Sequence, residues 1–332
     1  MDFLQEIPEE TFRDILLRVP YKSQSKIKQL LEPAKEIMEC SQFYQDRAKF
    51  GLLKQYICVL KPGSISIYDP IDQTCVQIAP LPKGFQTSPS TQTVSVNHKI
   101  VLLWLEHNHD SDSRRILIYD LLTSTWKQGA KMPTPTSYFT SFTCCPSPQG
   151  SIYIAEGEPM YGIDKLRGAA VYKVDKDMWE LLPKMQEGIR MSKSVFIEGM
   201  FYVIDLSNHR IQRFNPNTKV WTTIENISEG VEYVNVLYAF GRLIATTLSK
   251  IYEYDWEENV WKELETLAQH LWFAHATVWC DRIFFMRRNN LSGPPVFYMY
   301  KPGAALSDRW ISVAKPKKFK ENKVKCITTI EI

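Results

Sequence analysis

Six histidines are the first residues to test for metal or acid–base chemistry, and only one group of them has ligand-like spacing. His107, His109, Asp110 and Asp112 lie within one short polar segment. Alternate imidazole and carboxylate groups in such a segment can hold a cation weakly. The same polar pattern is typical of a solvent-exposed hairpin tip. We interpret the segment as a hairpin tip and predict no metal site.

The seven cysteines form no recognisable metal or redox motif. Their number is odd, they are scattered along the chain, and no Cys-x-x-Cys pair occurs. The chain also lacks a Walker loop, a Gly-x-Gly-x-x-Gly motif, a Gly-x-Ser-x-Gly elbow and a His-Glu-x-x-His pair. We therefore predict reduced thiols, no cofactor and no catalytic activity.

Composition and charge exclude several other classes of protein. The 332 residues are 44% hydrophobic and 23% charged, which is typical of a globular chain. No apolar run approaches the roughly 18 residues of a membrane helix, and the first six residues lack the features of a secretory signal. We therefore expect a cytoplasmic or nuclear protein. The net charge of +3 does not indicate a broad nucleic-acid-binding face.

The lysine-rich segment 315–325 is the one strongly charged stretch. Residues 315–332 contain six lysines and two glutamates, which gives a local charge of +4. Such a cluster suits nuclear import or phosphate binding. Its position before the last predicted strand favours a solvated linker instead.

An internal repeat organises most of the chain. An aromatic residue is followed seven positions later by Trp in four places, and two further pairs fit the same frame less closely. The four are Tyr119 with Trp126, Tyr172 with Trp179, Phe214 with Trp221 and Tyr254 with Trp261; the further two are Tyr68 with Cys75 and Tyr300 with Trp310. We expect each repeated Trp to be buried within or between the repeating units.

The repeating unit of about 40 to 50 residues contains four short β-branched and aromatic runs, as a propeller blade does. In the third unit these runs lie near 139–144, 151–155, 169–174 and 178–182. The first unit lacks its first strand, whereas residues 324–331 form a spare strand after the last unit. We predict that this strand completes the first blade, giving a six-bladed β-propeller over residues 51–332.

The repeats resemble plant kelch repeats over residues 54–332. They depart from the usual kelch pattern because no unit has the double glycine after its first strand. A single glycine remains there in three units, at Gly150, Gly199 and Gly241. The resemblance implies the same fold, a mainly β propeller of kelch type.

Residues 1–50 have a helical rather than a strand period. Phe12, Ile15, Leu16 and Val19 follow a proline and two glutamates, which suit a helix start. The apolar spacing recurs over 27–38, with Pro33 ending one helix and opening the next, and we expect Ser41 to cap a last helix. Fifty residues in three or four short helices are marginal alone, which predicts a docking module. Alternatively, these helices merely cap the propeller.

Residues 4–20 and 41–47 resemble the start and end of an F-box, and an F-box before a kelch propeller is similar to the plant F-box/kelch receptors. The resemblance implies binding to the Skp-type adaptor of a cullin ubiquitin ligase. By position, the adaptor contact would include six residues: Ile7, Pro8, Phe12, Ile15, Leu16 and Val19. One departure is that the Cys-Arg-x-Trp element of the F-box is replaced by Leu31-Glu32-Pro33-Ala34.

A target protein would be expected on the propeller face that collects the longer loops, since loops on rigid scaffolds usually carry specificity. Arginine and aromatic residues dominate interface hot spots, so these residues in or beside the loops are candidates. They are Arg114, Arg115, Tyr161, Arg167, Arg190, His209, His270, Trp272, Arg287 and Arg288.

Three functions remain open from the sequence. The resemblance implies a substrate receptor of a ubiquitin ligase, and related receptors recognise phenylalanine ammonia-lyase or type-B response regulators. A kelch scaffold that binds a partner without degrading it, or a propeller enzyme acting through its loop face, would also fit the residues.

Overall fold

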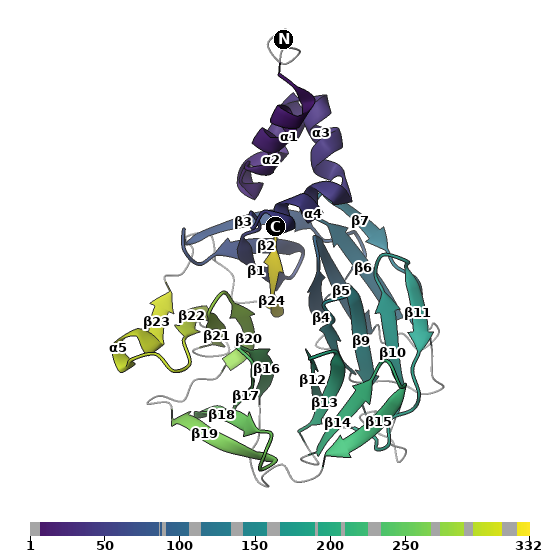
Figure 1. Ribbon diagram of the computed structural model, residues 1–332, viewed down its shortest axis with the longest axis vertical. Coiled ribbons are helices and arrows are strands. Elements are labelled where there is room, and N and C mark those ends of the chain that lie inside the picture. The colour runs from purple at the N-terminus through teal and green to yellow at the C-terminus, as the bar shows by residue number, and fades with distance from the viewer. Residues whose placement is uncertain are drawn as a thin grey trace.

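A computed structural model of the chain describes residues 7–85, 87, 91–105, 114–133, 142–157, 167–189, 192–206, 210–224, 234–266, 273–288, 295–313 and 324–332. Within them, four amino-terminal helices stand on one side of a six-bladed β-propeller (Figure 1). The predicted fold class is therefore confirmed.

The helices are short and closely spaced. They are α1 (Glu9–Leu17), α2 (Tyr21–Leu30), α3 (Glu32–Glu39) and α4 (Ser41–Lys49), and a fifth, α5 (Leu306–Arg309), lies in the last blade. Pro33 lies in the first turn of α3, as predicted. The expected capping role of Ser41 is wrong, because Cys40 is the N-cap residue of α4 and no side chain caps that helix.

Each blade is a four-stranded antiparallel sheet that extends from an innermost strand near the ring axis to an outermost strand. In that order, blade one contains β24 (Cys326–Glu331), β1 (Gln55–Lys61), β2 (Ser64–Asp69) and β3 (Thr74–Pro80). Blade two contains β4 (Gln92–Val96), β5 (Lys99–Leu105), β6 (Arg114–Asp120) and β7 (Thr125–Gln128). Blade three contains β8 (Phe142–Pro146), β9 (Ser151–Glu156), β10 (Ala169–Lys173) and β11 (Met178–Leu181).

The other three blades repeat this order. Blade four contains β12 (Ser192–Ile197), β13 (Met200–Asp205), β14 (Arg210–Asn215) and β15 (Val220–Ile224). Blade five contains β16 (Asn235–Ala239), β17 (Arg242–Thr246), β18 (Lys250–Asp255) and β19 (Val260–Thr266). Blade six contains β20 (Phe273–Trp279), β21 (Arg282–Arg288), β22 (Pro295–Tyr300) and β23 (Trp310–Val313).

The carboxyl-terminal strand closes the ring. β24 pairs antiparallel with β1 from Cys326 opposite Leu60 to Glu331 opposite Gln55. β24 also contacts β20 of blade six and β4 of blade two, so it holds the innermost place of blade one. This is the pairing that the strand count in the sequence predicts.

The repeated aromatic pair is a cross-strand pair between the two outer strands of every blade. The six pairs in register are Tyr68 with Cys75, Tyr119 with Trp126, Tyr172 with Trp179, Phe214 with Trp221, Tyr254 with Trp261 and Tyr300 with Trp310. In four blades the residue after the aromatic is Asp or Asn, and its side chain accepts two backbone N–H groups of the turn. These residues are Asp69, Asp120, Asn215 and Asp255.

The constant spacing of seven has a backbone cause. Five residues after the aromatic, the chain adopts a positive φ of 50° to 58° at Gln73, Ser124, Asp177, Lys219 and Asn259. Such a left-handed residue ends each of these hairpin turns, and the Asx hydrogen bonds of Asp69, Asp120, Asn215 and Asp255 support four of them. One turn geometry therefore sets the cross-strand partner of the aromatic in five blades.

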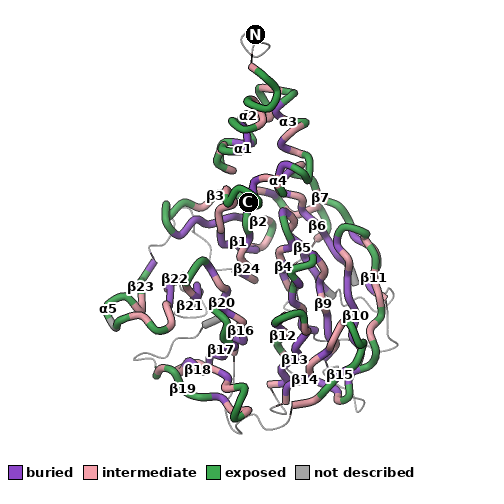
Figure 2. Tube along the Cα trace, in the orientation of Figure 1, coloured by how far each residue is buried: buried purple, intermediate pink, exposed green. Residues whose placement is uncertain are grey.

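Six hydrophobic clusters lie between neighbouring blades and form the core. The repeated Trp residues join blades by hydrogen bonds as well. The indole of Trp221 in blade four donates to the Pro183 carbonyl at 2.8 Å, and that of Trp179 in blade three donates to the Ala130 carbonyl at 3.0 Å. In Figure 2 the second strands of the blades, such as β13 and β17, are mainly buried, whereas outer strands such as β11 and β19 are largely exposed.

The propeller has two faces that are set by strand direction. One face carries the turns between the first and second and between the third and fourth strands of each blade, such as 97–98 and 121–124. We call it the helix face, because the helices stand on it. The opposite face carries the second-to-third and inter-blade connections, and we call it the loop face.

Candidate interaction surfaces

The four helices form a small core of their own. Leu16, Leu17, Ala34, Met38 and Phe43 are each at most 3% exposed and pack together. Two consecutive leucines of α1 are buried because both α3 and α4 contact this helix. A small Ala34 stands at the centre of this core.

Arg47 ties the end of α4 to the chain around it. Its guanidinium donates hydrogen bonds to the backbone carbonyls of Leu17, Val19 and Leu52, the last two at 2.9 Å each. Burial lowers the pKa of Arg47, which shows that the charge is desolvated. The side chain therefore fixes the end of α1 against the linker that leads into β1.

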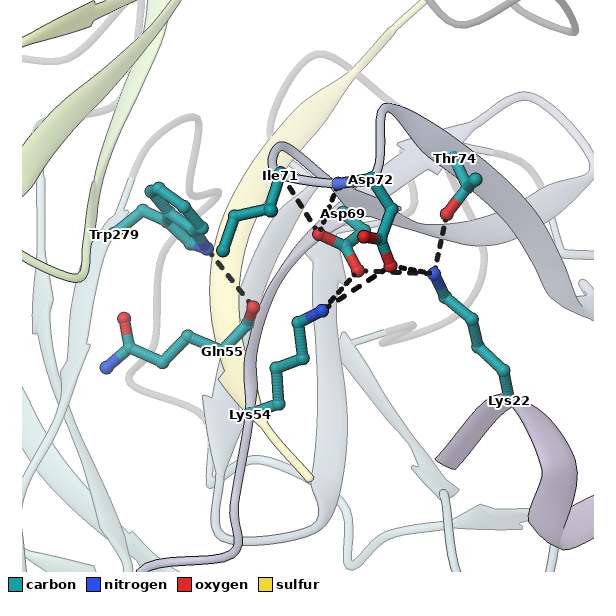
Figure 3. Close-up of polar contacts among 8 residues, drawn as sticks. All are labelled: Lys22, Lys54, Gln55, Asp69, Ile71, Asp72, Thr74 and Trp279. Carbon is teal, nitrogen blue, oxygen red and sulfur yellow. Dashed lines mark hydrogen bonds and ion pairs between the residues drawn. The ribbon is translucent and has the colours of Figure 1, made fainter. Parts of the chain in front are cut away.

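Two lysines and two aspartates join the helices to blade one (Figure 3). Lys22 of α2 donates to Asp69 at 3.2 Å and Asp72 at 2.9 Å, and also to the Thr74 hydroxyl at 2.7 Å. Lys54 lies 2.8 Å from the same carboxylate of Asp69. The cluster therefore bonds α2, the linker and the β2–β3 turn to one another.

The electrostatics of this cluster centre on Asp69, whose side chain is fully buried. Burial alone would raise the pKa of Asp69, but hydrogen bonds from Lys54, the Asp72 amide and Lys22 outweigh it and lower the pKa to about 2. Burial likewise acts to lower the pKa of Lys22, and the hydrogen bonds to Asp72 and Asp69 raise it instead. Each partner therefore stabilises the charged form of the other.

Blade two makes further contacts with the helices. The Lys28 ammonium donates to the Leu122 carbonyl in the β6–β7 turn and lies 3.4 Å from Glu39 of α3. The ring of Tyr44 lies 5.1 Å from that of His98 in the β4–β5 turn. With the Lys22 cluster, these contacts seat the helices across two adjacent blades, so the helical module and the propeller form one packed unit.

The helical module has large apolar side chains that the propeller does not cover. Ile15 of α1 is 51% exposed and Leu30 of α2 is 66% exposed, although both are large hydrophobic residues. Pro8, directly before α1, is exposed, and Ile7 is half-buried. Exposed apolar residues on a small helical module mark a candidate protein-binding surface.

Several plant proteins are similar to this chain, although no protein-family model matches it. F-box/kelch-repeat protein SKIP11 of Arabidopsis thaliana is 25% identical over 209 residues, which is 60% of this chain and 42% of that protein. F-box/kelch-repeat protein At1g15670 of the same plant is 25% identical over 228 residues, 61% of this chain and 62% of that protein. F-box/kelch-repeat protein SKIP20 is 23% identical over 288 residues, 68% of this chain and 67% of that protein.

The chain is a homologue of the plant F-box/kelch-repeat proteins. It spans 42% of the length of SKIP11 and 62% of the length of At1g15670. Four helices followed by a six-bladed ring are the architecture that an F-box/kelch homologue should have.

The structure separates the predicted adaptor residues into two groups. Leu16 is buried in the helical core, and Phe12 and Val19 pack partly buried against it, so these three stabilise the module. Ile15 and Pro8 are exposed, and Ile7 is partly so. An adaptor contact by this second group stays a prediction.

The predicted target residues fall on the loop face where the structure describes them. Arg114 and Arg115 begin β6, and Arg287 and Arg288 end β21; only their backbone is described. Arg167 is exposed just before β10. The other five lie outside the described residues: Tyr161, Arg190, His209, His270 and Trp272. Their role as target contacts stays a prediction.

Sequence reasoning missed the residues that hold the two parts together. Lys22, Lys28, Tyr44 and Asp69 belong to elements that are distant along the chain, so no local spacing links them. Of these four residues, only Asp69 belongs to the repeated pattern, because it is the Asp or Asn that follows the aromatic residue and accepts hydrogen bonds from the turn.

Metal-binding and membrane-spanning features are both absent from the part of the chain that the structure describes. No group of three or more His, Cys, Asp or Glu side chains there could hold a metal ion, and the predicted hairpin 107–112 lies outside that part. Within the same described ranges, no helix is long and apolar enough to cross a membrane.

Proposed function

We propose that the chain is a substrate receptor of a Skp-cullin-F-box ubiquitin ligase. The helical module docks the adaptor, and the loop face of the propeller binds a target protein for ubiquitination, in the cytoplasm or nucleus. The observation that carries the proposal is the seating of the helices on the face opposite the loops. A rigid arrangement of this kind holds a bound target at a fixed place relative to the ligase.

Two features support the adaptor half of the proposal. The relatives are F-box/kelch-repeat proteins, and the module exposes Ile15 and Leu30, which the propeller does not cover. The substitution of the usual F-box aromatic by Ala34 changes the interior of the module, since Ala34 is completely buried. The exposed residues therefore carry the docking surface.

The direct experiment is a binding measurement between the purified chain and a plant Skp-type adaptor. We expect Ile15→Asp to weaken binding by about tenfold or more, because a charge would be placed in an apolar contact. Leu181→Asp is the matched control, since Leu181 is a 67% exposed apolar residue on the outer strand β11. Equal adaptor binding by the wild type and Ile15→Asp would reject this docking mode.

The same experiment separates the alternative functions. A chain that binds its target tightly but no adaptor is a kelch scaffold that does not promote degradation. Substrate turnover by the purified chain, lost on substitution of loop-face residues, would instead identify an enzyme. Phenylalanine ammonia-lyase and type-B response regulators are the targets to test first, by following their abundance when the proteasome is inhibited.

A further inference from the structure

The six innermost strands surround the axis of the ring and carry almost no charge. They are β4, β8, β12, β16, β20 and β24, and each contacts the innermost strands of its neighbours. Among their described residues, Lys193 of β12 is the only lysine or arginine and Glu331 of β24 is the only carboxylate. Lys193 lies at the loop-face end of its strand, whereas Glu331 lies at the helix-face end.

Among the described residues, the titratable groups that act on Lys193 are two thiols. The thiols of Cys144 in β8 and Cys326 in β24 are the groups that interact electrostatically with its ammonium. Burial raises the pKa of both thiols, so both are uncharged at neutral pH. Cys144 donates to the Gln92 side chain at 3.2 Å.

Lys193 has no carboxylate partner within the described ranges of the chain. Asp205 lies opposite the adjacent Ser192 in the β12–β13 pair, but it is buried and does not act on the Lys193 ammonium. Other lysines of the propeller are paired, such as Lys99 with Asp175 at 2.7 Å and Lys250 with Glu263 at 2.6 Å. Among the residues that the structure describes, no anionic group therefore compensates the charge of Lys193.

The side chain of Lys193 is nevertheless accessible. Surrounding protein atoms desolvate its ammonium and lower its pKa, yet the residue as a whole is exposed to solvent. Both observations fit a side chain on an innermost strand whose ammonium lies near the ring axis. A desolvated cation interacts more strongly with an incoming anion than a surface cation does.

We propose that Lys193 receives the carboxylate of an Asp or Glu side chain that the target protein inserts along the ring axis from the loop face. This inference rests on the proposed function, because it requires the target to bind that face. A carboxylate suits the site better than a phosphate does. One lysine among hydroxyl, thiol and amide groups balances one negative charge, whereas phosphate sites usually gather several arginines.

The test uses random twelve-residue peptides displayed on phage and selected on the immobilised full chain. We expect the wild type to enrich Asp or Glu at one peptide position by about tenfold over the library, as one desolvated ion pair would produce. Lys193→Met should abolish that enrichment, and Lys193→Glu should replace it with Lys or Arg. Lys184→Met is the control, since Lys184 is exposed in the connection leading to β12 on the same face.

Several results would overturn the inference. These are a wild type that selects no peptide, selected peptides without an acidic position, or the same acidic preference in Lys193→Met. Selected peptides are then resynthesised with Glu, Gln or phosphoserine at the acidic position. If the phosphoserine peptide binds about tenfold more tightly than the Glu peptide, and this gain requires Lys193, the ligand of the site is a phosphate and not a carboxylate.

Two controls keep the result readable. Lys193→Arg keeps the positive charge and should therefore keep the preference for acidic peptides. It is the reference variant if Lys193→Met melts at a lower temperature than the wild type. A folded Lys193→Arg variant without the preference would contradict the ion pair. Adaptor binding should be equal for the wild type and Lys193→Met. A wild type that binds no adaptor rejects the ligase function and leaves the peptide result intact.

Discussion

Asp69→Asn is the sharpest test of how the helices are held on the ring. One carboxylate oxygen of Asp69 accepts the backbone N–H groups of Ile71 and Asp72, and the other accepts Lys22 and Lys54. Blade four uses an asparagine at the equivalent position, where Asn215 accepts the same two turn N–H groups. Asparagine should therefore keep the turn and remove only the charge.

The expected loss follows from the pKa of Asp69. A fall from 3.8 to about 2 on folding corresponds to about 2 kcal/mol of stabilisation of the folded state. Lys22 and Lys54 are 30% and 40% exposed, so screening by solvent reduces the expected cost to about 1 to 2 kcal/mol.

The pH dependence has a definite sign. The pKa of Asp69 is lower in the folded than in the unfolded chain, so the stabilisation is complete above about pH 5 and is lost as the pH falls toward 2. The difference in unfolding free energy between the wild type and Asp69→Asn should therefore fall to about half of its neutral value near pH 3.

Urea unfolding at several pH values measures this difference. Asp175→Asn is the control, because Asp175 is 65% exposed and pairs with Lys99 at the protein surface. That substitution should cost less than about 0.5 kcal/mol at any pH. The reasoning is refuted if Asp69→Asn costs no more than Asp175→Asn at pH 7, or if its cost does not change with pH.

Three further predictions concern the ring and the helical module. Removal of residues 324–332 should abolish cooperative thermal unfolding, because β1, β4 and β20 would lose a shared strand; a truncated chain that melts like the parent contradicts ring closure. Trp221→Ala should lower the unfolding free energy by about 3 kcal/mol or more, measured by urea unfolding, because Trp221 is 3% exposed between two blades; a loss under about 1 kcal/mol would argue against the inter-blade role. Arg47→Met should speed amide hydrogen exchange in α1 and α4 while leaving blade four unchanged, and uniform exchange across both regions would show that Arg47 does not act locally.

The propeller could be predicted from the sequence because its signal is local and repeated. The aromatic and the Trp seven residues later face one another across one hairpin, and the same left-handed turn residue fixes their register in five blades. Blade six keeps the pair in register despite three extra residues, which α5 accommodates. Ring closure followed from counting strands, since a blade with a missing strand needs one from elsewhere.

The helical module was less predictable in detail. The spacing of α1 identified an apolar stripe, but it did not separate Leu16, which is buried, from Ile15, which is exposed. That distinction depends on where α3 and α4 pack. Ser41 was expected to cap α4 from its residue type alone, yet the helix begins one position earlier than that role requires.

Contacts between distant elements left no trace in the sequence pattern. Lys22 and Asp69 are 47 residues apart, and each occurs in an ordinary local setting. Lys193 appeared as one lysine among many until the structure placed it on an innermost strand of the ring. The loop-face candidates rested on residue type alone, because connecting loops have no period that would fix their geometry.

Hydrogen exchange of the full chain with and without a plant Skp-type adaptor tests the central claim most directly. The adaptor should slow exchange in α1 and α2, around Ile15 and Leu30, and leave the loop-face ends of the blade strands unchanged. Protection on the loop face, or no protection of the helices at saturating adaptor, would contradict the claim.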